Sequence, residues 1–200
     1  MNIYPKTLEN AIDFYKKLPG IGEKSAERLA LATLELDKQD LEDFSEQLLK
    51  MDEIHHCPIC GHITDNETCN ICNDDTRDKS IICITEDSKS VFTFEKSGHY
   101  KGVYHVLNGL ISPIDDIGPE DINIDSLVKR VKDIPDVELI LSLKSNIEGE
   151  TTMLYLKKIF ENTNVKISRL SYGIPIGTEI DYLDPITIDK ALTDRKIISE

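Results

Sequence analysis

The sequence predicts an α+β protein of several modules, with helices first, a cysteine knuckle in the middle and a mainly parallel α/β sheet domain after it. Three observations indicate this class. Residues 7–51 have helical apolar spacing, residues 57–72 hold two C-x-x-C pairs, and residues 81–170 alternate short β-branched runs with helical segments. A short C-terminal segment completes the 200 residues, which suffice for modules with cores of their own.

Three helices are expected before the knuckle. The first begins at a capping Thr7 and ends before Pro19, because proline disfavours helix in the residue that precedes it. The second covers residues 23–36, and the third follows a cap at Asp40. The third helix carries an apolar stripe that we expect to be core, formed by Leu41, Phe44, Leu48 and Met51.

The turn between the first two helices has the sequence LPGIG, residues 18–22. Glycines let the backbone approach a phosphate closely, and the amides that open the next helix point toward an anion with a favourable dipole. The alternative is an ordinary glycine turn between packed helices. The turn and its basic flanks give the candidate phosphate contacts Lys16, Lys17, Gly20, Gly22, Lys24 and Arg28.

The net charge limits any nucleic-acid function. The chain carries a formal charge of −14, and residues 1–56 hold seven Lys and Arg against twelve Asp and Glu, a balance of −5. Because phosphate repels an acidic surface, binding requires a local basic patch and would be independent of base sequence. No window approaches the ~18 apolar residues of a membrane span, and residues 1–17 lack the apolar run of a secretory signal, which predicts a cytoplasmic protein.

The two C-x-x-C pairs predict a metal site. Cys57 and Cys60, with Cys69 and Cys72, can supply the four-sulfur tetrahedral shell that Zn²⁺ prefers. Such a shell leaves no position for water or substrate, so the ion is expected to be structural, one per chain. Two disulfides or reduced core cysteines are the alternatives, and a cytosolic compartment disfavours the disulfides. The three nearby histidines could replace a cysteine but are not needed, and Cys83 is expected to be a core thiol.

Strands alternate with helices after the knuckle. Strands are expected at residues 81–85, 103–107, 138–143 and 165–170, and helices at 91–98, 125–131 and 150–160. This order predicts a parallel sheet covered on both faces, with functional residues at the carboxyl ends of its strands. A last helix should run from a cap at Thr187 to about Asp194, in a segment that either closes the sheet domain or crosses to a neighbouring subunit.

Acidic residues follow the first and third strands. The arrangement resembles the Toprim domain, in which a glutamate after the first strand and an Asp-x-Asp after the third hold magnesium. Here the Asp-x-Asp is replaced by residues 144–146, Lys-Ser-Asn, and an ammonium group at a ligand position repels Mg²⁺. The carboxylates are either solvated loop groups or a rim for a basic partner, formed by Glu86, Asp87, Glu148 and Glu150.

The N-terminal turn with its two helices resembles the helix-hairpin-helix motif of DNA-binding proteins. Helix-hairpin-helix, four-cysteine knuckle and degenerate Toprim domain, in this order over nearly the whole chain, resemble the RecR family of bacterial recombination mediators. The stretches that carry the likeness are LPGIGEKSAERLA (18–30), CPICGHI (57–63), YKGVYHVL (100–107), IGPEDI (117–122), NIEGE (146–150) and YGIPIG (172–177).

The resemblance implies a DNA repair protein that is not an enzyme. It implies action with RecO and RecF to load RecA onto single-stranded DNA at gaps and breaks, binding to single- and double-stranded DNA near the nucleoid, and assembly into homodimers or ring-like homotetramers. Lys24 and Arg28 fall on the family's DNA-contacting positions, and Glu86 and Asp87 on the surface implicated in contacting RecO.

The expected modules are residues 1–54 for DNA binding and assembly, 55–78 for the zinc finger, 79–175 for the Toprim domain, and 176–200 as a C-terminal segment that could join subunits. Two departures from the family lie on the partner face: Lys144-Ser145 replaces the usual Asn-Pro, and Ser90 stands where aspartate is common. Two alternatives remain, a magnesium-dependent Toprim nuclease or primase and an adaptor that binds only proteins.

Overall fold

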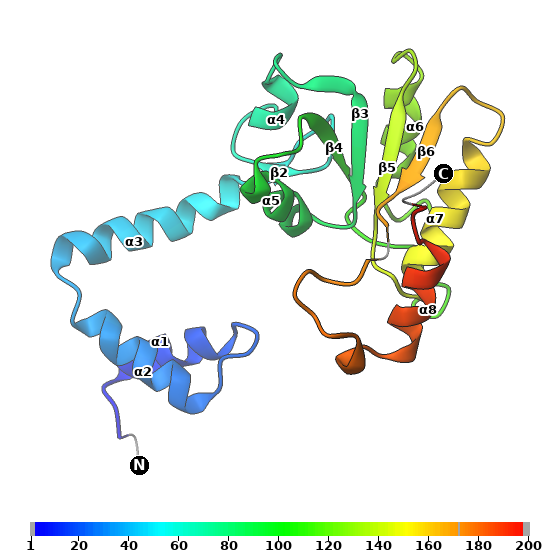
Figure 1. Cartoon of the computed structure of the whole chain (residues 1–200). Helices are drawn as coiled ribbons and strands as arrows, with labels where there is room; N and C mark the ends of the chain where they lie inside the picture. Colours follow the sequence, from blue (N-terminus) through cyan, green and yellow to red (C-terminus); the bar gives the residue numbers. More distant parts are fainter. Residues whose placement is uncertain (1–2, 172, 198–200) are drawn as a thin grey trace. The chain divides into compact units, whose positions relative to one another are not determined.

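The computed structural model describes residues 3–171 and 173–197, and the chain divides into two compact units, Met1–Ile54 and His55–Glu200 (Figure 1). Residue 172, which opens the YGIPIG motif, lies outside the described residues. None of the described helices combines the length and the apolar composition needed to cross a bilayer.

The first unit is helical. It contains α1 (Lys6–Lys16), α2 (Glu23–Leu34), α3 (Lys38–Lys50) and a 3₁₀ turn, η1 (Met51–Glu53). Two predicted caps are wrong. Pro5, not Thr7, precedes α1, and no side chain of the described residues caps that helix. The cap of α3 is Asp37, whose carboxylate accepts a hydrogen bond from the amide of Asp40 at 2.9 Å.

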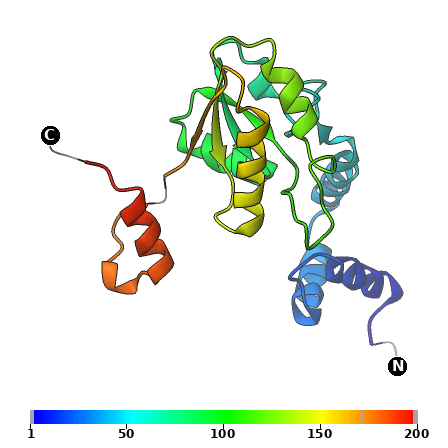
Figure 2. The ribbon, with the colours of Figure 1, turned by 90° about the vertical axis from the view of Figure 1, so that its right-hand side faces the viewer.

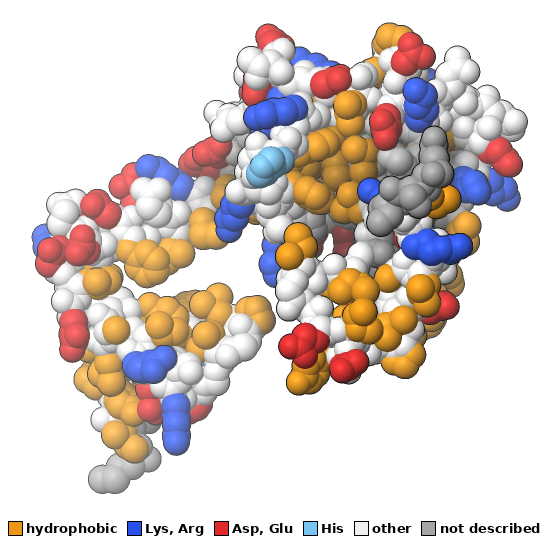
Figure 3. All heavy atoms as spheres, in the orientation of Figure 1, with side chains coloured by type: hydrophobic (Ala, Val, Ile, Leu, Met, Phe, Trp, Pro, Cys, Tyr) orange, Lys and Arg blue, Asp and Glu red, His pale blue; other side chains and the backbone are white. Residues whose placement is uncertain are grey.

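The core of the first unit is small. It consists of four buried side chains from α1 and α2, which are Leu8, Ile12, Ala26 and Ala30. The prediction that the α3 stripe is also core is wrong for the single chain, because its side chains are 43% to 61% exposed. Hydrophobic side chains gather along α3 in the space-filling view (Figure 3). This unit therefore leaves apolar surface uncovered that a stable monomer normally buries.

The second unit opens with the knuckle. Strands β1 (His55–His56) and β2 (Ile63–Thr64) pair in antiparallel fashion, and α4 (Asn70–Asn73) follows. The chain then enters a four-stranded sheet of order β4-β3-β5-β6, in which every pairing is parallel, as predicted. Its strands are β3 (Asp78–Thr85), β4 (Gly102–Val106), β5 (Glu138–Ser142) and β6 (Lys166–Arg169).

Helices cover both faces of this sheet (Figure 2). Helix α5 (Ser88–Ser97) packs through Val91 on the face that holds Cys83 and Tyr104. Helices α6 (Ile124–Val131) and α7 (Ile147–Ile159) cover the opposite face, where the larger core lies. Cys83 is 2% exposed, which confirms that it is a core thiol. The β-branched strands and amphipathic helices thus bury one another as the alternating pattern predicts.

The C-terminal segment contains η2 (Ile180–Tyr182) and α8 (Pro185–Thr193). Thr187 is not the cap of α8. Asp184 is the cap, and its carboxylate accepts a hydrogen bond from the amide of Thr187 at 2.9 Å. An ion pair of 2.7 Å between Arg169 and Asp194 ties the end of α8 to strand β6. The helix is therefore linked to the edge of the sheet within one chain.

His105 is a titratable group inside this core. It is fully buried in β4, and its Nε2 lies 2.8 Å from the carbonyl oxygen of Asn123. Its Nδ1 has no partner among the described residues. A second proton would therefore sit on a nitrogen without an acceptor, and burial lowers the pKa of His105 to about 4.

We expect His105 to make the protein sensitive to mild acid. The unfolded chain takes up this proton near pH 6.5 and the folded chain only near pH 4, so stability falls as the pH drops between these values, by up to about 3 kcal/mol. Thermal melts between pH 7 and pH 4 test this. His105→Gln should show a shallower loss, since the other acid-sensitive groups are common to both proteins. Parallel pH profiles would contradict the prediction.

Candidate functional site

The four knuckle cysteines converge on one point. Cys57 and Cys60 flank a tight turn closed by the Gly61 amide, which donates to the Cys57 carbonyl oxygen at 2.8 Å. Cys69 precedes α4 and Cys72 lies in it. All four sulfur atoms lie within 4.8 Å of one another, and all four side chains are buried. The two sequence-distant pairs therefore form a single site.

The donor set fits zinc. A tetrahedral ion with Zn–S bonds of about 2.3 Å holds its sulfur atoms about 3.8 Å apart, which the cluster matches with Cys60 and Cys69 sulfurs at 3.5 Å. The cysteines are free thiols. Backbone amides of Cys69 and Cys72 donate to sulfur at 3.5 Å, and hydrogen bonds from the Cys60 and Cys72 side chains lower the pKa of the Cys69 thiol. Thiolate, the form that binds metal, is thus favoured there.

The knuckle is docked directly on the sheet. The amide of Val106 in β4 donates to the Cys60 carbonyl oxygen at 2.7 Å. Gly61 makes the close approach possible: its φ is +74°, and a Cβ there would lie 2.6 Å from the Val106 oxygen and 2.5 Å from the Asn123 side chain. His62 stacks edge-on against the Phe92 ring at 5.0 Å and does not join the cluster. Sequence spacing predicted the sulfur set but not this docking.

The hairpin has an open surface above its glycines. Gly20 has a φ of +81°, which favours glycine, and the Ile21 amide closes the turn on the Leu18 oxygen at 3.1 Å. Gly22 precedes α2 and offers no side-chain cap. A Cβ at Gly20 or Gly22 would meet none of the described atoms within 4 Å. The first amides of α2 therefore face an accessible surface at which an external anion can accept their hydrogen bonds.

The four basic residues of the hairpin differ in their partners. Lys16 pairs with Glu23 at 2.7 Å, a contact that raises the lysine pKa. The Lys17 ammonium lies 4.4 Å from the centre of the Phe14 ring. Lys24 and Arg28, one helical turn apart on α2, are exposed and have neither ion pair nor side-chain hydrogen bond within the described ranges. These two cations are available to a ligand.

An acidic edge forms where strands β3 and β5 end. Glu86 follows β3, and its Oε1 lies 2.7 Å from the Nζ of Lys144, which follows β5. Asp87 caps α5 by accepting hydrogen bonds from the amide and the hydroxyl of Ser90, both at 2.9 Å. The hydrogen bond from the Ser90 backbone amide is the main cause that lowers the pKa of Asp87. Ser90 therefore acts as an intramolecular donor to this carboxylate.

The third-strand loop supplies the rest of the edge. Asn146 caps α7 by accepting from the Gly149 amide at 3.0 Å, and Glu148 and Glu150 lie in the first turn of that helix. Lys190 of α8 approaches Glu150 at 3.8 Å and donates to the Ser145 hydroxyl. The sequence did not indicate the place of Lys190, because a contact across forty residues leaves no local signal in one sequence.

The acidic edge does not fit magnesium. Mg²⁺ requires an octahedral shell of oxygen atoms. In the positions of the Asp-x-Asp motif, Lys144 contributes an ammonium group that is bound to Glu86, and the Asn146 oxygen accepts from the Gly149 amide. That these residues replace the acidic ligands stays a prediction, and no magnesium-dependent step can be derived from this donor set.

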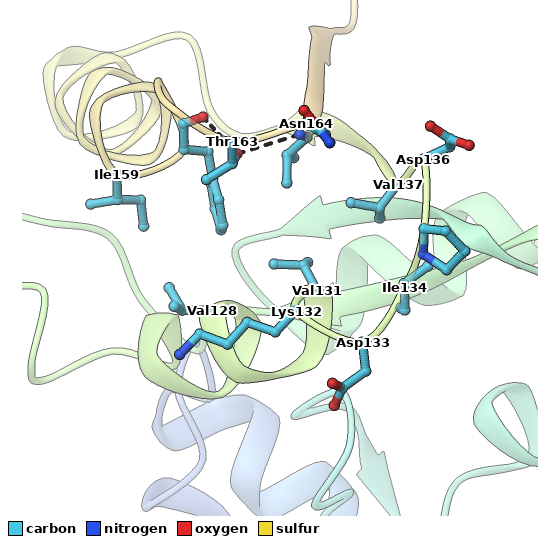
Figure 4. Close-up of a pocket in the computed structure, with 13 residues that line it drawn as sticks. Val128, Val131, Lys132, Asp133, Ile134, Asp136, Val137, Ile159, Thr163 and Asn164 are labelled. Atoms are coloured by element: carbon cyan, nitrogen blue, oxygen red, sulfur yellow. Dashed lines mark hydrogen bonds between the residues drawn. The ribbon is translucent and has the colours of Figure 1, made fainter.

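The opposite end of the sheet holds a cavity of about 710 Å³, beyond the amino ends of β5 and β6 (Figure 4). Val131, Val137 and Ile159 point into it, whereas the carboxylates of Asp133 and Asp136 point away. Ligand sites combine an apolar wall with a few convergent polar groups. The labelled charged groups do not converge here, so this cavity is not a candidate site.

Comparison with known proteins identifies the modules. Family models match as the RecR helix-hairpin-helix over residues 8–51, the RecR four-cysteine zinc finger domain over 54–74, the Toprim domain over 80–171, and the RecR C-terminal region over 173–196. Proteins named Recombination protein RecR from Staphylococcus aureus (strain Mu3) and Staphylococcus haemolyticus are each 46% identical over 193 residues, which cover 96% of this chain and 98% of the relative. The predicted resemblance and fold class are confirmed, and the chain belongs to the RecR family of recombination mediators.

Proposed function

We propose that this protein is a non-enzymatic mediator of DNA repair and recombination that holds DNA and recruits other proteins to it. The observation that carries the proposal is the hairpin. There, Lys24 and Arg28 have no ion-pair partner among the described residues and lie beside the open N-terminus of α2, in a chain that belongs to the RecR family. The Toprim edge lacks a magnesium donor set within the described part of the chain, which disfavours a nuclease or primase.

The proposed DNA contact is to the phosphate backbone. Helix N-terminal amides bind anionic oxygens and the two side chains add positive charge, while neither feature reads a base edge. Gly20 and Gly22 leave room for the backbone of DNA to come close, and Lys16 and Lys17 flank the same turn. Single- and double-stranded DNA present the same phosphates, so both are proposed ligands. A chain of charge −14 must therefore bind through this local surface.

We expect the double substitution Lys24→Ala with Arg28→Ala to weaken DNA binding. Loss of two phosphate contacts should reduce affinity roughly tenfold at low salt and lower the slope of log K against log salt by about 1.8 for duplex DNA. Fluorescence anisotropy with a labelled oligonucleotide over a salt series measures both quantities. The control is Lys38→Ala, an exposed lysine on α3 that pairs with Glu42 at 3.6 Å. Unchanged affinity in the double variant would remove the hairpin as the DNA site.

We propose that Cys57, Cys60, Cys69 and Cys72 hold one structural zinc ion. The ion would supply bonds that close the knuckle, and four protein ligands leave no coordination position for catalysis. Apolar packing is scarce at this point, since Ile71 is the only partly buried hydrophobic residue of the described chain that packs against the four cysteines. Metal binding and folding are expected to be coupled here.

Removal of the metal should unfold the knuckle. Cys69→Ser should lower the zinc content from one ion per chain toward zero, because one thiolate of the tetrahedral shell is lost. Atomic emission on the purified protein measures the ion, and amide hydrogen exchange in residues 55–74 measures the order of the knuckle. Cys83→Ala, which removes a buried thiol outside the cluster, should retain the metal. A metal-free protein with a protected knuckle would contradict the assignment.

We propose that the protein assembles into homodimers or homotetramers. The support is the uncovered apolar stripe of α3, defined by Leu41, Phe44, Leu48 and Met51, on a unit whose own core has four buried side chains among the described residues. A second copy of the chain can bury this stripe. Helix α8 also exposes apolar side chains, with Ile186 at 69% and Leu192 at 59% exposure. Residues 176–200 are therefore a second candidate for contacts between subunits.

Charge on the α3 stripe should dissociate the assembly. Phe44→Glu with Leu48→Glu places two carboxylates in the proposed interface, where their desolvation is unfavourable, so the mass should fall toward 22.6 kDa. Light scattering coupled to size exclusion measures this mass. Gln39→Glu adds charge away from the stripe on the same helix and should leave the mass unchanged. A wild-type protein that is already monomeric would refute the proposed assembly.

The acidic edge is proposed to dock protein partners. The family resemblance implies RecO and RecF, which act with RecR to load RecA at single-stranded gaps and breaks, and a carboxylate rim suits a basic protein surface. The proposed contacts are Glu86, Asp87, Glu148 and Glu150. In this arrangement residues 1–54 bind DNA and assemble, 55–78 hold zinc and 79–175 meet partners. Action on the chromosome would place the protein at the nucleoid in the cytoplasm.

A further inference from the structure

Lys144 occupies a specific place at the acidic edge. Strands β3 and β5 are neighbours in register, with Thr85 opposite Ser142, so the residues that follow them meet at the same end of the sheet. There Lys144 lies 2.7 Å from Glu86. The Glu86 side chain is only 20% exposed, whereas the Lys144 side chain is 63% exposed. The lysine therefore reaches from solvent to a half-buried carboxylate.

The charged groups that act on this ammonium are acidic. Glu86 contributes most to a raised pKa of Lys144, with smaller contributions from Asp87 and Glu148. Lys144 is therefore positively charged at neutral pH. Lys190 provides a second cation near Glu150, at 3.8 Å. The edge is neutralised in part by the chain itself.

We infer that Lys144 is a resident counterion that prevents divalent cations from binding at the acidic edge. The inference rests on the proposed function in taking the edge as a protein-docking surface rather than a metal site. An ammonium group about 4 Å from a dication disfavours it roughly ten- to thirtyfold, even at the dielectric constant of water. The ammonium also binds one of the two Glu86 carboxylate oxygens, so a metal ion at Glu86 would compete with it.

This arrangement makes protein docking at the edge independent of the magnesium concentration. A bare carboxylate cluster changes its net charge when divalent cations bind, and a basic partner would then compete with the ion. A tethered ammonium group neutralises Glu86 at every magnesium concentration. Asp87 and Glu148 have no ion pair with Lys144 or Lys190 and keep their negative charge for the partner. Lys144 thus makes the edge favour basic side chains of a protein partner over divalent cations.

Lys144→Asn tests the inference in the full-length, zinc-loaded protein. Mn²⁺ serves as the probe, and the electron paramagnetic resonance signal of the free ion measures binding. Asparagine removes the charge and adds a carbonyl oxygen, so the affinity of the edge for Mn²⁺ should rise at least about tenfold over the wild type. Lys144→Arg keeps the charge and should bind Mn²⁺ as weakly as the wild type. Adding Glu86→Gln to Lys144→Asn should abolish the gain, which assigns it to this edge and not to other surface carboxylates.

Three results would overturn the inference: equal Mn²⁺ affinity in the wild type and Lys144→Asn, the same gain in Lys144→Arg, or a gain that survives Glu86→Gln. Thermal melts of each variant confirm that it is folded before titration. The DNA affinity of the wild-type protein is measured separately and does not depend on this edge. A protein that fails to bind DNA would refute the proposed function, whereas the manganese results decide the role of Lys144.

Discussion

The convergence of four cysteine sulfurs within 4.8 Å is the constraint on which the middle of the molecule depends. Two C-x-x-C turns come together there, and Ile71 is the only partly buried hydrophobic residue of the described chain that packs against them, so the four cysteines receive little support from apolar burial. The knuckle is attached to the sheet by a hydrogen bond of 2.7 Å from the Val106 amide to the Cys60 carbonyl oxygen. A knuckle held by sulfur thus also supports strand β4.

The sheet has retained the Toprim topology while its carboxyl edge has changed chemistry. Parallel strands bring Glu86 and the loop after β5 together whatever residues the loop contains. With acidic residues in that loop, the edge would concentrate negative charge and favour a metal ion. With Lys144 it forms an ion pair, and the remaining carboxylates face solvent or α8. One side chain therefore changes the ligands that this position can bind without altering the fold.

Much of this architecture could be predicted from the sequence, because it rests on local patterns. The alternation of β-branched runs with amphipathic segments specified the parallel sheet, and cysteine spacing specified the cluster. The three predicted caps at Thr7, Asp40 and Thr187 were wrong, since a proline or an aspartate two or three residues earlier precedes each helix. The stripe of α3 has a helical period, which does not reveal whether the covering surface belongs to the same chain or to another. The contacts of Lys144 and Lys190 required the folded topology.

Assembly and DNA binding are physically linked in the proposed mediator. Within its described residues, one chain offers two exposed cations at the hairpin that have neither an ion pair nor a ring contact, Lys24 and Arg28, since Lys16 is bound to Glu23 and Lys17 lies over the Phe14 ring. Two phosphate contacts give a weak, strongly salt-dependent interaction on a protein whose net charge is −14. The α3 stripe lies on the same helical unit as the hairpin, so an assembly that buries the stripe between copies contains several hairpins. Multivalent binding multiplies the affinities of linked sites, provided that their geometry lets all of them reach one DNA molecule. In the proposed assembly, burial of the apolar stripe therefore raises the DNA affinity above what the basic side chains of one chain provide.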